Sequence, residues 1–139
     1  MTKVLVLHDY ADVAKITEVT NIITTQGYAL EIYACSNYNA SLAQDADILV
    51  VLISTKAKVC RAINDKILNM EQKGKRTIGI WTPNAKESDL SENLKKYAEA
   101  VVCWESAKII GALNGSINTH DAAATCTVRE IPPPRVRKC

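Results

Sequence analysis

The chain has 139 residues, the size of one domain with a single hydrophobic core. Its 47% apolar and 23% charged residues are ordinary for a soluble globular protein, and no apolar run approaches the roughly 18 residues of a membrane span. The net charge of +2 is too small to indicate nucleic-acid binding, and the first residues show no signal peptide. We therefore expect a cytoplasmic protein with neither a membrane nor a nucleic-acid partner.

Strand-like and helix-like runs alternate along the first 115 residues. In chain order the pattern predicts strand 3–8, helix 12–27, strand 28–34, short helix 40–46, strand 47–54, helix 60–72, strand 77–81, helix 87–100, strand 100–104 and helix 106–115. The run 47–54 is the most apolar, which is typical of a central strand buried on both faces. Asp12 is the expected N-cap of the first helix and Gly27 its stop signal.

This alternation predicts an α/β, flavodoxin-like fold: a five-stranded parallel sheet with helices on both faces. The periodicity stops at Gly115, so we divide the chain into a domain over residues 1–115 and a tail or arm over residues 116–139. The tail is basic and Pro-rich, and Pro132 to Pro134 favour an extended conformation. It either lies over the domain surface, with an edge strand around residues 126–131, or grips another subunit or an anionic ligand.

The five cysteines give no pattern of a metal site or of a disulfide framework. Their number is odd, no pair is spaced CxxC, and the chain has only two histidines. We therefore expect reduced thiols and no bound metal.

Several catalytic motifs are missing. No Gly-rich phosphate loop follows the first strand, and neither a GxSxG elbow nor an HExxH motif occurs. A response-regulator receiver is the nearest alternative with this strand order, and it needs an acidic cluster after the first strand, a phosphate-accepting Asp after the third and a Lys after the fifth. Because the third strand ends in Ser54 and the fifth in Trp104, we do not expect a phosphorylated receiver.

Polar and aromatic residues gather where the predicted strands end. In an open parallel sheet, ligands bind at this edge, near the point where the winding reverses. The candidate ligand residues there are His8, Asp9, Tyr10, Ser54 and Trp81. A carboxylate can accept from a ribose hydroxyl, a serine can bind phosphate, and an indole can stack on a base, so these residues suit a nucleotide-like ligand. The alternative is that they only cap helices and pack.

Three motifs carry a family resemblance: "VLIS" (51–54), "KGKRTIGI" (73–80) and "VVCW" (101–104). With the opening "VLVLHDYAD" (4–12), they resemble the TIR-like family of small bacterial proteins, which includes the TIR subunits of Thoeris-type antiphage defence systems. The resemblance covers roughly residues 1–115. It implies the same flavodoxin-like fold, and NAD or an NAD-derived nucleotide as the ligand, because active members use a helix Glu to break the nicotinamide–ribose bond of NAD.

The register of this resemblance places Lys66 where the family has that Glu. An ammonium there would oppose the positive charge that develops as the glycosidic bond breaks, and could pair with a phosphate instead. Lys66 is therefore a further ligand-binding candidate, with a packing alternative in which its stem covers apolar surface and its ammonium reaches water. Asp65 and Glu71 are nearby carboxylates, but neither has the family position.

Three hypotheses follow for the function, and they leave open whether the chain is an enzyme. The first is a TIR-like adaptor or sensor of antiviral defence, without the usual NADase acid. It would work as a homo-oligomer or with a partner effector protein, through a loop that contains Asn37 and Tyr38. The second is a TIR-type NAD glycohydrolase or cyclase that uses Asp65 or Glu71 as its catalytic carboxylate. The third is a nucleoside deoxyribosyltransferase-like enzyme.

Overall fold

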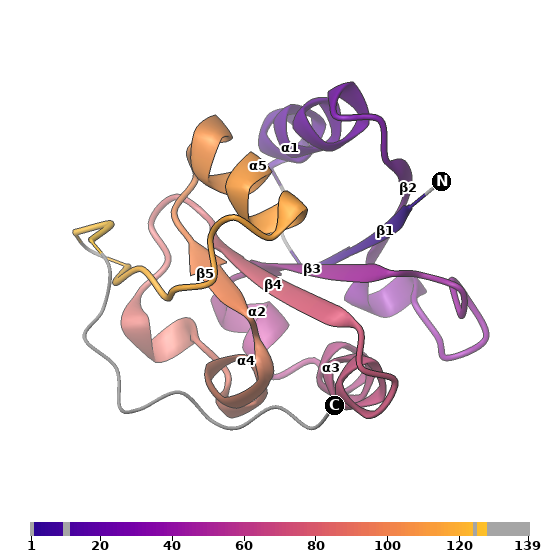
Figure 1. Cartoon of the computed structure of the whole chain (residues 1–139). Helices are drawn as coiled ribbons and strands as arrows, with labels where there is room; N and C mark the ends of the chain where they lie inside the picture. The colour runs from indigo at the N-terminus through magenta and orange to yellow at the C-terminus, as the bar shows by residue number, and fades with distance from the viewer. Residues whose placement is uncertain (1, 10–11, 124, 128–139) are drawn as a thin grey trace.

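Five parallel strands form the sheet at the centre of the molecule (Figure 1). They are β1 (Lys3–His8), β2 (Ala29–Ala34), β3 (Ile48–Ile53), β4 (Arg76–Trp81) and β5 (Ala100–Val102), in the spatial order β2-β1-β3-β4-β5. The computed structural model describes residues 2–9, 12–123 and 125–127. The predicted flavodoxin-like sheet is confirmed, and its winding reverses between β1 and β3.

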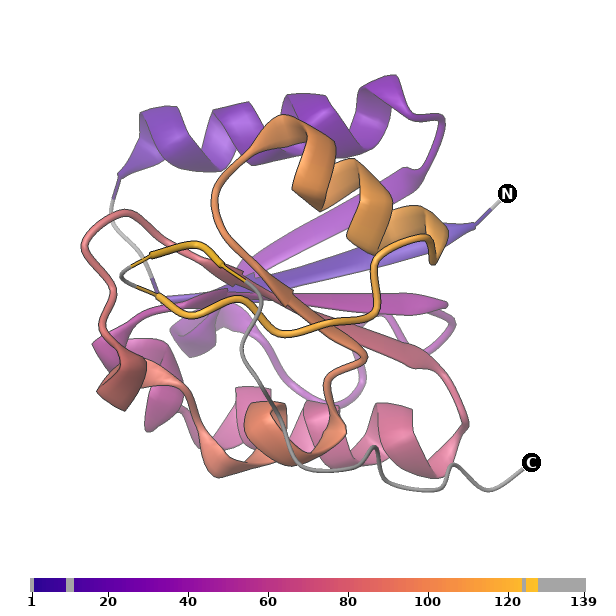
Figure 2. The ribbon, with the colours of Figure 1, turned by 60° about the vertical axis from the view of Figure 1, so that its left-hand side comes forward.

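Helices cover both faces of the sheet (Figure 2). One face packs against α1 (Val13–Thr25) and α5 (Ser106–Asn114), and the other against α2 (Thr55–Lys58), α3 (Arg61–Gln72) and α4 (Glu92–Tyr97). One 3₁₀ turn, η1 (Cys35–Asn37), follows β2, and another, η2 (Glu87–Asp89), precedes α4. In the described part of the chain, none of the helices has both the length and the apolar character needed to cross a membrane.

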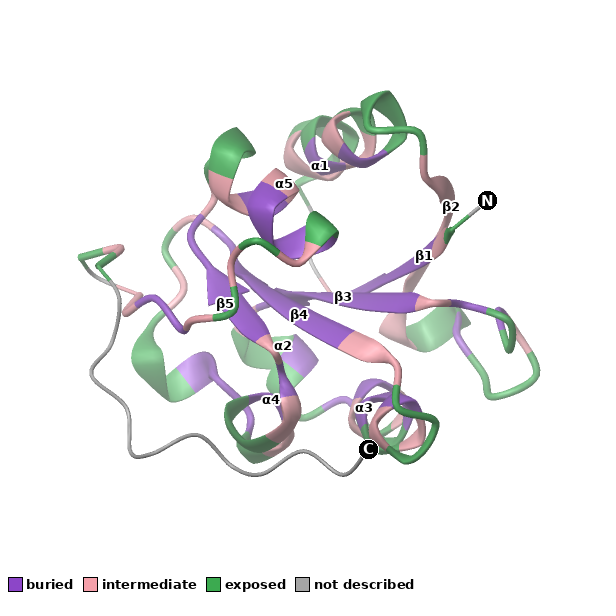
Figure 3. Cartoon of the chain, viewed as in Figure 1, coloured by how far each residue is buried: buried purple, intermediate pink, exposed green. Residues whose placement is uncertain are grey.

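The central strand β3 is buried along its whole length, as its apolar sequence predicts (Figure 3). Its alternate side chains enter two separate cores. Leu49, Val51 and Ile53 pack on the side of α3, whereas Val50 and Leu52 pack on the side of α1 and α5. Because side chains alternate across a strand, one apolar run supplies both layers of the fold.

The predicted helix over residues 40–46 is wrong, because the structure has turns there. Ala43 has a left-handed φ of 49°, and the side chain of Asn39 accepts a hydrogen bond from Ser41 N at 2.9 Å. Such local side-chain bonds compete with the backbone bonds of a helix.

The predicted helix over residues 87–100 is divided in two. Asp89 Oδ2 accepts a hydrogen bond from Lys86 N at 2.9 Å and closes η2. Ser91 Oγ accepts one from Leu94 N at 3.2 Å and starts α4. Between them Leu90 is extended (ψ 117°), so two capping side chains interrupt the apolar periodicity.

The expectation of reduced thiols is also wrong for the described cysteines. The structure pairs Cys35 with Cys60 and Cys103 with Cys126, with Cα–Cα distances of 6.2 and 5.6 Å. The fifth cysteine, Cys139, lies outside the described residues. Spacing along the sequence does not report which residues the sheet brings together, so the odd count and the lack of CxxC were misleading.

The chain after α5 returns to the sheet. Val101 N donates to Thr119 O at 3.0 Å and Asp121 N donates to Val101 O at 2.7 Å, so His120 bridges in parallel to the edge of β5. This bridge precedes the edge strand expected around residues 126–131, of which 128–131 lie outside the described residues, as do Pro132 to Pro134. The division of the chain after Gly115 stays a prediction.

Candidate functional site

The carboxyl ends of the strands carry most of the predicted ligand residues. His8 ends β1 and is buried, and Asp9 follows it with partial exposure. Tyr10 lies outside the described residues. Ser54 follows β3, and Trp81 ends β4. The contacts of the last two show that both have structural roles at this edge.

Ser54 caps the short helix that follows β3. Its Oγ accepts a hydrogen bond from Ala57 N at 3.2 Å, and the next residue, Thr55, donates from Oγ1 to Asp89 Oδ1 at 2.8 Å. The bond from the backbone N–H of Lys86, and then that of the Thr55 hydroxyl, hold the pKa of Asp89 below its ordinary value despite burial. This charged carboxylate joins the loops after β3 and β4.

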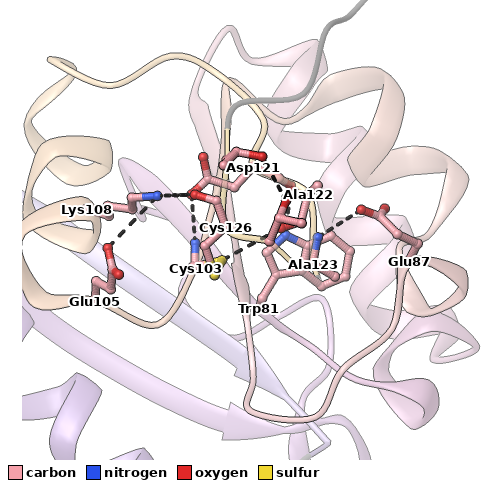
Figure 4. The surroundings of a disulfide bond; sticks show 11 residues. Trp81, Glu87, Cys103, Glu105, Lys108, Asp121, Ala122, Ala123 and Cys126 are labelled. Atoms are coloured by element: carbon pink, nitrogen blue, oxygen red, sulfur yellow. Dashed lines mark hydrogen bonds and ion pairs between the residues drawn. A yellow bond between two sulfur atoms is a disulfide. The ribbon is translucent and has the colours of Figure 1, made fainter.

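Trp81 holds the segment that follows α5. The indole is only 3% exposed, and its Nε1–H donates to the carbonyl oxygen of Asp121 at 3.0 Å (Figure 4). The buried carboxylate of Asp121 accepts from Cys103 N at 3.1 Å and from Lys108 Nζ at 2.8 Å. With the Cys103–Cys126 disulfide, these bonds fix the segment against β5. Stacking of Trp81 on a ligand ring stays a prediction.

A groove of about 580 Å³ opens between the loop after η1 and one side of α3. Small-molecule sites commonly have volumes of roughly 300–1,000 Å³. Residues that line it include Tyr38 and Gln44 from the loop and Ala62, Asp65, Lys66 and Asn69 from the helix. The helix residues share one face because they recur at intervals of three and four. Arg61 and Lys73 line the groove from the two ends of α3.

Lys66 is the buried cation of this groove. The residue is 6% exposed, and its Nζ donates to Asn69 Oδ1 at 3.2 Å. Among the described residues, no carboxylate lies within ion-pair distance of that ammonium. Burial, and then the nearby charge of Lys73, lowers the pKa of Lys66. The groove therefore contains a desolvated cation whose only described partner is a neutral amide.

Two links hold the sides of the groove together. The Cys35–Cys60 disulfide joins the first residue of η1 to the N-cap of α3, where Cys60 Sγ also accepts from Ile63 N at 3.4 Å. Lys73 Nζ donates to Gln44 O at 3.3 Å at the other end. The loop and helix are therefore fixed relative to each other before any ligand binds.

The structure brings together three of the predicted residues, Tyr38, Asp65 and Lys66, at this groove. Asn37 is exposed just before Tyr38, and Glu71 lies later on α3 outside the groove lining. Asp65 is exposed and faces Arg61 at 3.8 Å.

The sequence reasoning missed Arg61, Lys73 and Asn69. The signal for Asn69 and Lys73 was available, because residues 62, 65, 66, 69 and 73 fall on one side of a helix, whereas Arg61 lies outside that series. The described residues contain no group of three or more His, Cys, Asp or Glu side chains arranged to hold a metal ion.

The sheet order and helix layers define a flavodoxin-like α/β protein, and the comparisons with known proteins agree with that class. No protein-family model matches the sequence, and no curated protein matches it. The chain is similar to a CheY-like response regulator receiver domain from Methanospirillum hungatei JF-1, at 16% identity and a TM-score of 0.58. That match covers 84% of this chain and 93% of the receiver.

Two further solved structures have the same fold. Chemotaxis protein CheY4 of Vibrio cholerae matches at 16% identity with a TM-score of 0.61, over 84% of this chain and 99% of CheY4. A flavodoxin from the domain Archaea matches at 10% identity with a TM-score of 0.51, over 81% of this chain and 92% of the flavodoxin. At these identities the likeness shows the fold alone.

The TIR resemblance is wrong, since these structural neighbours are receiver domains and a flavodoxin. The motifs behind it are two apolar strand ends and a basic turn before a strand, which this winding produces in many proteins. The hypotheses of an antiviral adaptor, an NAD-cleaving enzyme and a deoxyribosyltransferase are therefore withdrawn. Catalytic roles for Asp65 and Glu71, which belonged to the second hypothesis, stay predictions. Binding of a nucleotide-derived ligand stays an untested prediction.

Proposed function

We propose that this chain is a receiver-like signalling domain whose state is set by noncovalent binding and not by phosphorylation of an aspartate. Its likeness to a response regulator receiver domain and to a chemotaxis protein supports the signalling part of the proposal. Receiver domains take a phosphoryl group on an Asp after the third strand, and the end of β3 supports the noncovalent part.

The observation that carries the proposal is the structure around Ser54. The residue after Ile53 at the end of β3 is a serine, and its Oγ accepts the Ala57 N–H that starts α2. The next side chain, Thr55, is bonded to Asp89. The place of an acceptor carboxylate is therefore used for helix capping, which is a structural role.

The position after β5 differs from a receiver in the same way. The first lysine beyond β5 is Lys108, on α5, and its ammonium is bonded to Asp121 at 2.8 Å and to the Cys126 carbonyl oxygen at 2.6 Å. A lysine held in this way serves the segment after α5. These contacts of Lys108 support the proposal that the chain does not use the phosphorylation chemistry of receivers.

Phosphorylation from a small-molecule donor tests this proposal. The purified chain is incubated with acetyl phosphate and Mg²⁺, beside CheY4 of Vibrio cholerae as a positive control, and intact masses are measured before and after hydroxylamine treatment. We expect a hydroxylamine-sensitive phosphoryl group on CheY4 and none on this chain. A phosphoryl group of that kind on this chain would overturn the proposal.

We also propose that the bound state is passed on by contact with another protein chain, either a second copy or a separate partner. Light scattering after size-exclusion chromatography, over a range of concentrations, distinguishes the two. Concentration-dependent dimers would support a second copy as the contact, whereas a strict monomer would exclude it.

A further inference from the structure

The groove beside α3 has an excess of positive charge. Its lining includes the cations Arg61, Lys66 and Lys73 and one carboxylate, that of Asp65. The carboxylate lies 3.8 Å from Arg61 on the exposed surface of the helix. It therefore pairs with an exposed cation, Arg61, and leaves the buried ammonium of Lys66 without a counter-charge among the described residues.

Lys66 has fewer partners for its charge than the other buried charged groups described above. The buried carboxylate of Asp121 has the ammonium of Lys108 at 2.8 Å, and that of Asp89 accepts a backbone N–H and a hydroxyl. An ammonium has three N–H donors, and the described contacts of Lys66 use one of them, on the amide oxygen of Asn69. Burying a charge without a counter-charge costs stability, so this arrangement favours any anion that enters the groove.

We propose that the groove binds a small phosphomonoester, with its phosphate on the ammonium of Lys66. A phosphomonoester carries a charge of about −1.5 to −2 near neutral pH, which matches the excess of cations in the lining. Arg61 and Lys73 flank the phosphate from the two ends of α3, and the organic part of the ligand lies against Tyr38 and Ala62. The volume of about 580 Å³ fits such a body, because it is well above what a bare phosphate needs.

The walls of this groove suit binding without rearrangement. The Tyr38 hydroxyl donates to Leu42 O at 3.4 Å, and the Tyr38 ring lies 5.9 Å from that of Tyr33. With the Cys35–Cys60 disulfide, these contacts fix the loop side, so a ligand need not order it.

Protonation of Lys66 is linked to this binding. Burial and the charge of Lys73 lower the pKa of Lys66, while the charge of Asp45 acts in the opposite direction. The other charged groups of the lining, Arg61 and Asp65, face each other at 3.8 Å. A bound phosphate raises the pKa of Lys66, so binding takes up protons and weakens at alkaline pH.

Binding at this groove does not depend on the receiver-like role. Isothermal titration calorimetry tests it, with ribose 5-phosphate, inorganic phosphate and ribose as the probes. Three proteins are compared: the unmodified chain, Lys66→Met, and Lys56→Met as a control on an exposed lysine outside the groove. Methionine keeps the length of the lysine stem, so the Lys66→Met variant keeps its packing and loses its charge.

We expect ribose 5-phosphate to bind the unmodified chain more tightly than inorganic phosphate does, and ribose not to bind. Lys66→Met should weaken the affinity for ribose 5-phosphate by about tenfold or more, the usual loss for one charge-assisted hydrogen bond. Lys56→Met should leave that affinity unchanged. Absence of binding by both phosphate probes would overturn the proposal, as would an unchanged affinity in Lys66→Met. Equal affinity for the two phosphate probes would overturn the assignment of the organic body to Tyr38 and Ala62.

Discussion

Lys66 and Lys108 lie on helices that cover opposite faces of the sheet, and the more buried of the two has fewer partners. The Lys108 side chain is 27% exposed and faces Asp121 at 2.8 Å and Glu105 at 3.9 Å. Lys66 is 6% exposed, and its described partner is the amide of Asn69. The more exposed lysine, Lys108, therefore has two carboxylates beside it, whereas the buried Lys66 has none among the described residues. The placement of Lys66 costs stability, which is common for residues retained for binding.

The two disulfides differ in a similar way. They close loops of almost equal length, with sequence separations of 25 and 23 residues. The Cys103–Cys126 bond fixes the segment after α5 to the end of β5, in a cluster with Trp81 and Asp121 (Figure 4). The Cys35–Cys60 bond instead joins the two sides of the groove. The two disulfides thus constrain the unfolded chain to a similar degree, but in the folded chain only one of them joins the sides of the groove.

Removing each disulfide should have the largest effect. Two double variants test this: Cys35→Ala/Cys60→Ser, in which serine keeps the N-cap of α3, and Cys103→Ala/Cys126→Ala. Each should lose about 3 kcal/mol of unfolding free energy, because the unfolded chain gains similar entropy when a loop of this length is no longer closed. Urea denaturation measures both losses. Only the first variant should also have a weaker affinity for ribose 5-phosphate, measured by calorimetry.

The control for this pair is internal, since each variant serves as the other's reference. Equal loss of phosphate affinity in both would show that general destabilisation is the cause. It would then contradict a specific role of the Cys35–Cys60 bond in fixing the groove.

Replacing Lys108 should have the next largest effect. Lys108→Met removes the cation beside the buried Asp121 carboxylate, which keeps its bond from Cys103 N. We expect a loss of about 2 kcal/mol in unfolding free energy, below the full cost of breaking a buried pair because Lys108 is partly exposed. Glu105→Ala, at the exposed end of the same cluster, should cost less than about 1 kcal/mol. Equal losses in the two variants would refute a special role for the buried pair.

Lys66→Met should change stability in the opposite direction. It removes a buried charge that has no described counter-charge and keeps an apolar stem of similar length. We expect a gain of about 1 kcal/mol in unfolding free energy, while the same substitution at Lys108 causes a loss. A loss of stability in Lys66→Met would mean that this lysine has a structural role like that of Lys108.

The sequence predicted the sheet and its helix layers because these depend on apolar periodicity. The run 47–54 identified β3 as the central strand, and the spacing of Ile63, Ile67 and Met70 identified α3. Periodicity failed where a side-chain hydrogen bond to a nearby backbone N–H sets the local conformation. Asn39, just before residues 40–46, and Ser91, before α4, are the two cases.

The site was only partly predictable. Lys66 was visible as a cation on an apolar helix stripe, because one helix is enough to show it. Tyr38 and Gln44 reach the groove through a loop whose path depends on the Cys35–Cys60 disulfide, and nothing in the spacing of the cysteines indicated that pair. The predicted edge residues Ser54 and Trp81 were placed correctly at the ends of strands, but residue type alone could not show that capping and the segment after α5 already engage them.

The smallest expected effect is a dependence of stability on pH at alkaline values. Burial and Lys73 lower the pKa of Lys66 in the folded chain, so the unfolded chain binds more protons once the pH exceeds that lowered value. Stability from this group therefore rises with pH up to the ordinary pKa range of lysine. Denaturation midpoints between about pH 7 and about pH 10 should rise less steeply in Lys66→Met than in the unmodified chain, and Lys56→Met should keep the unmodified slope.

A saturating concentration of ribose 5-phosphate should remove part of the same slope, because a bound anion restores the protonated form of Lys66 and raises its pKa in the folded chain. Lys108 provides the contrast, since its charge is already balanced by Asp121 and Glu105 and the ligand does not reach it. Lys108→Met should therefore keep the full response to ribose 5-phosphate while being less stable at every pH. If Lys66→Met and the unmodified chain show the same slope and the same response to the ligand, the buried ammonium of Lys66 is not the group that the phosphate meets.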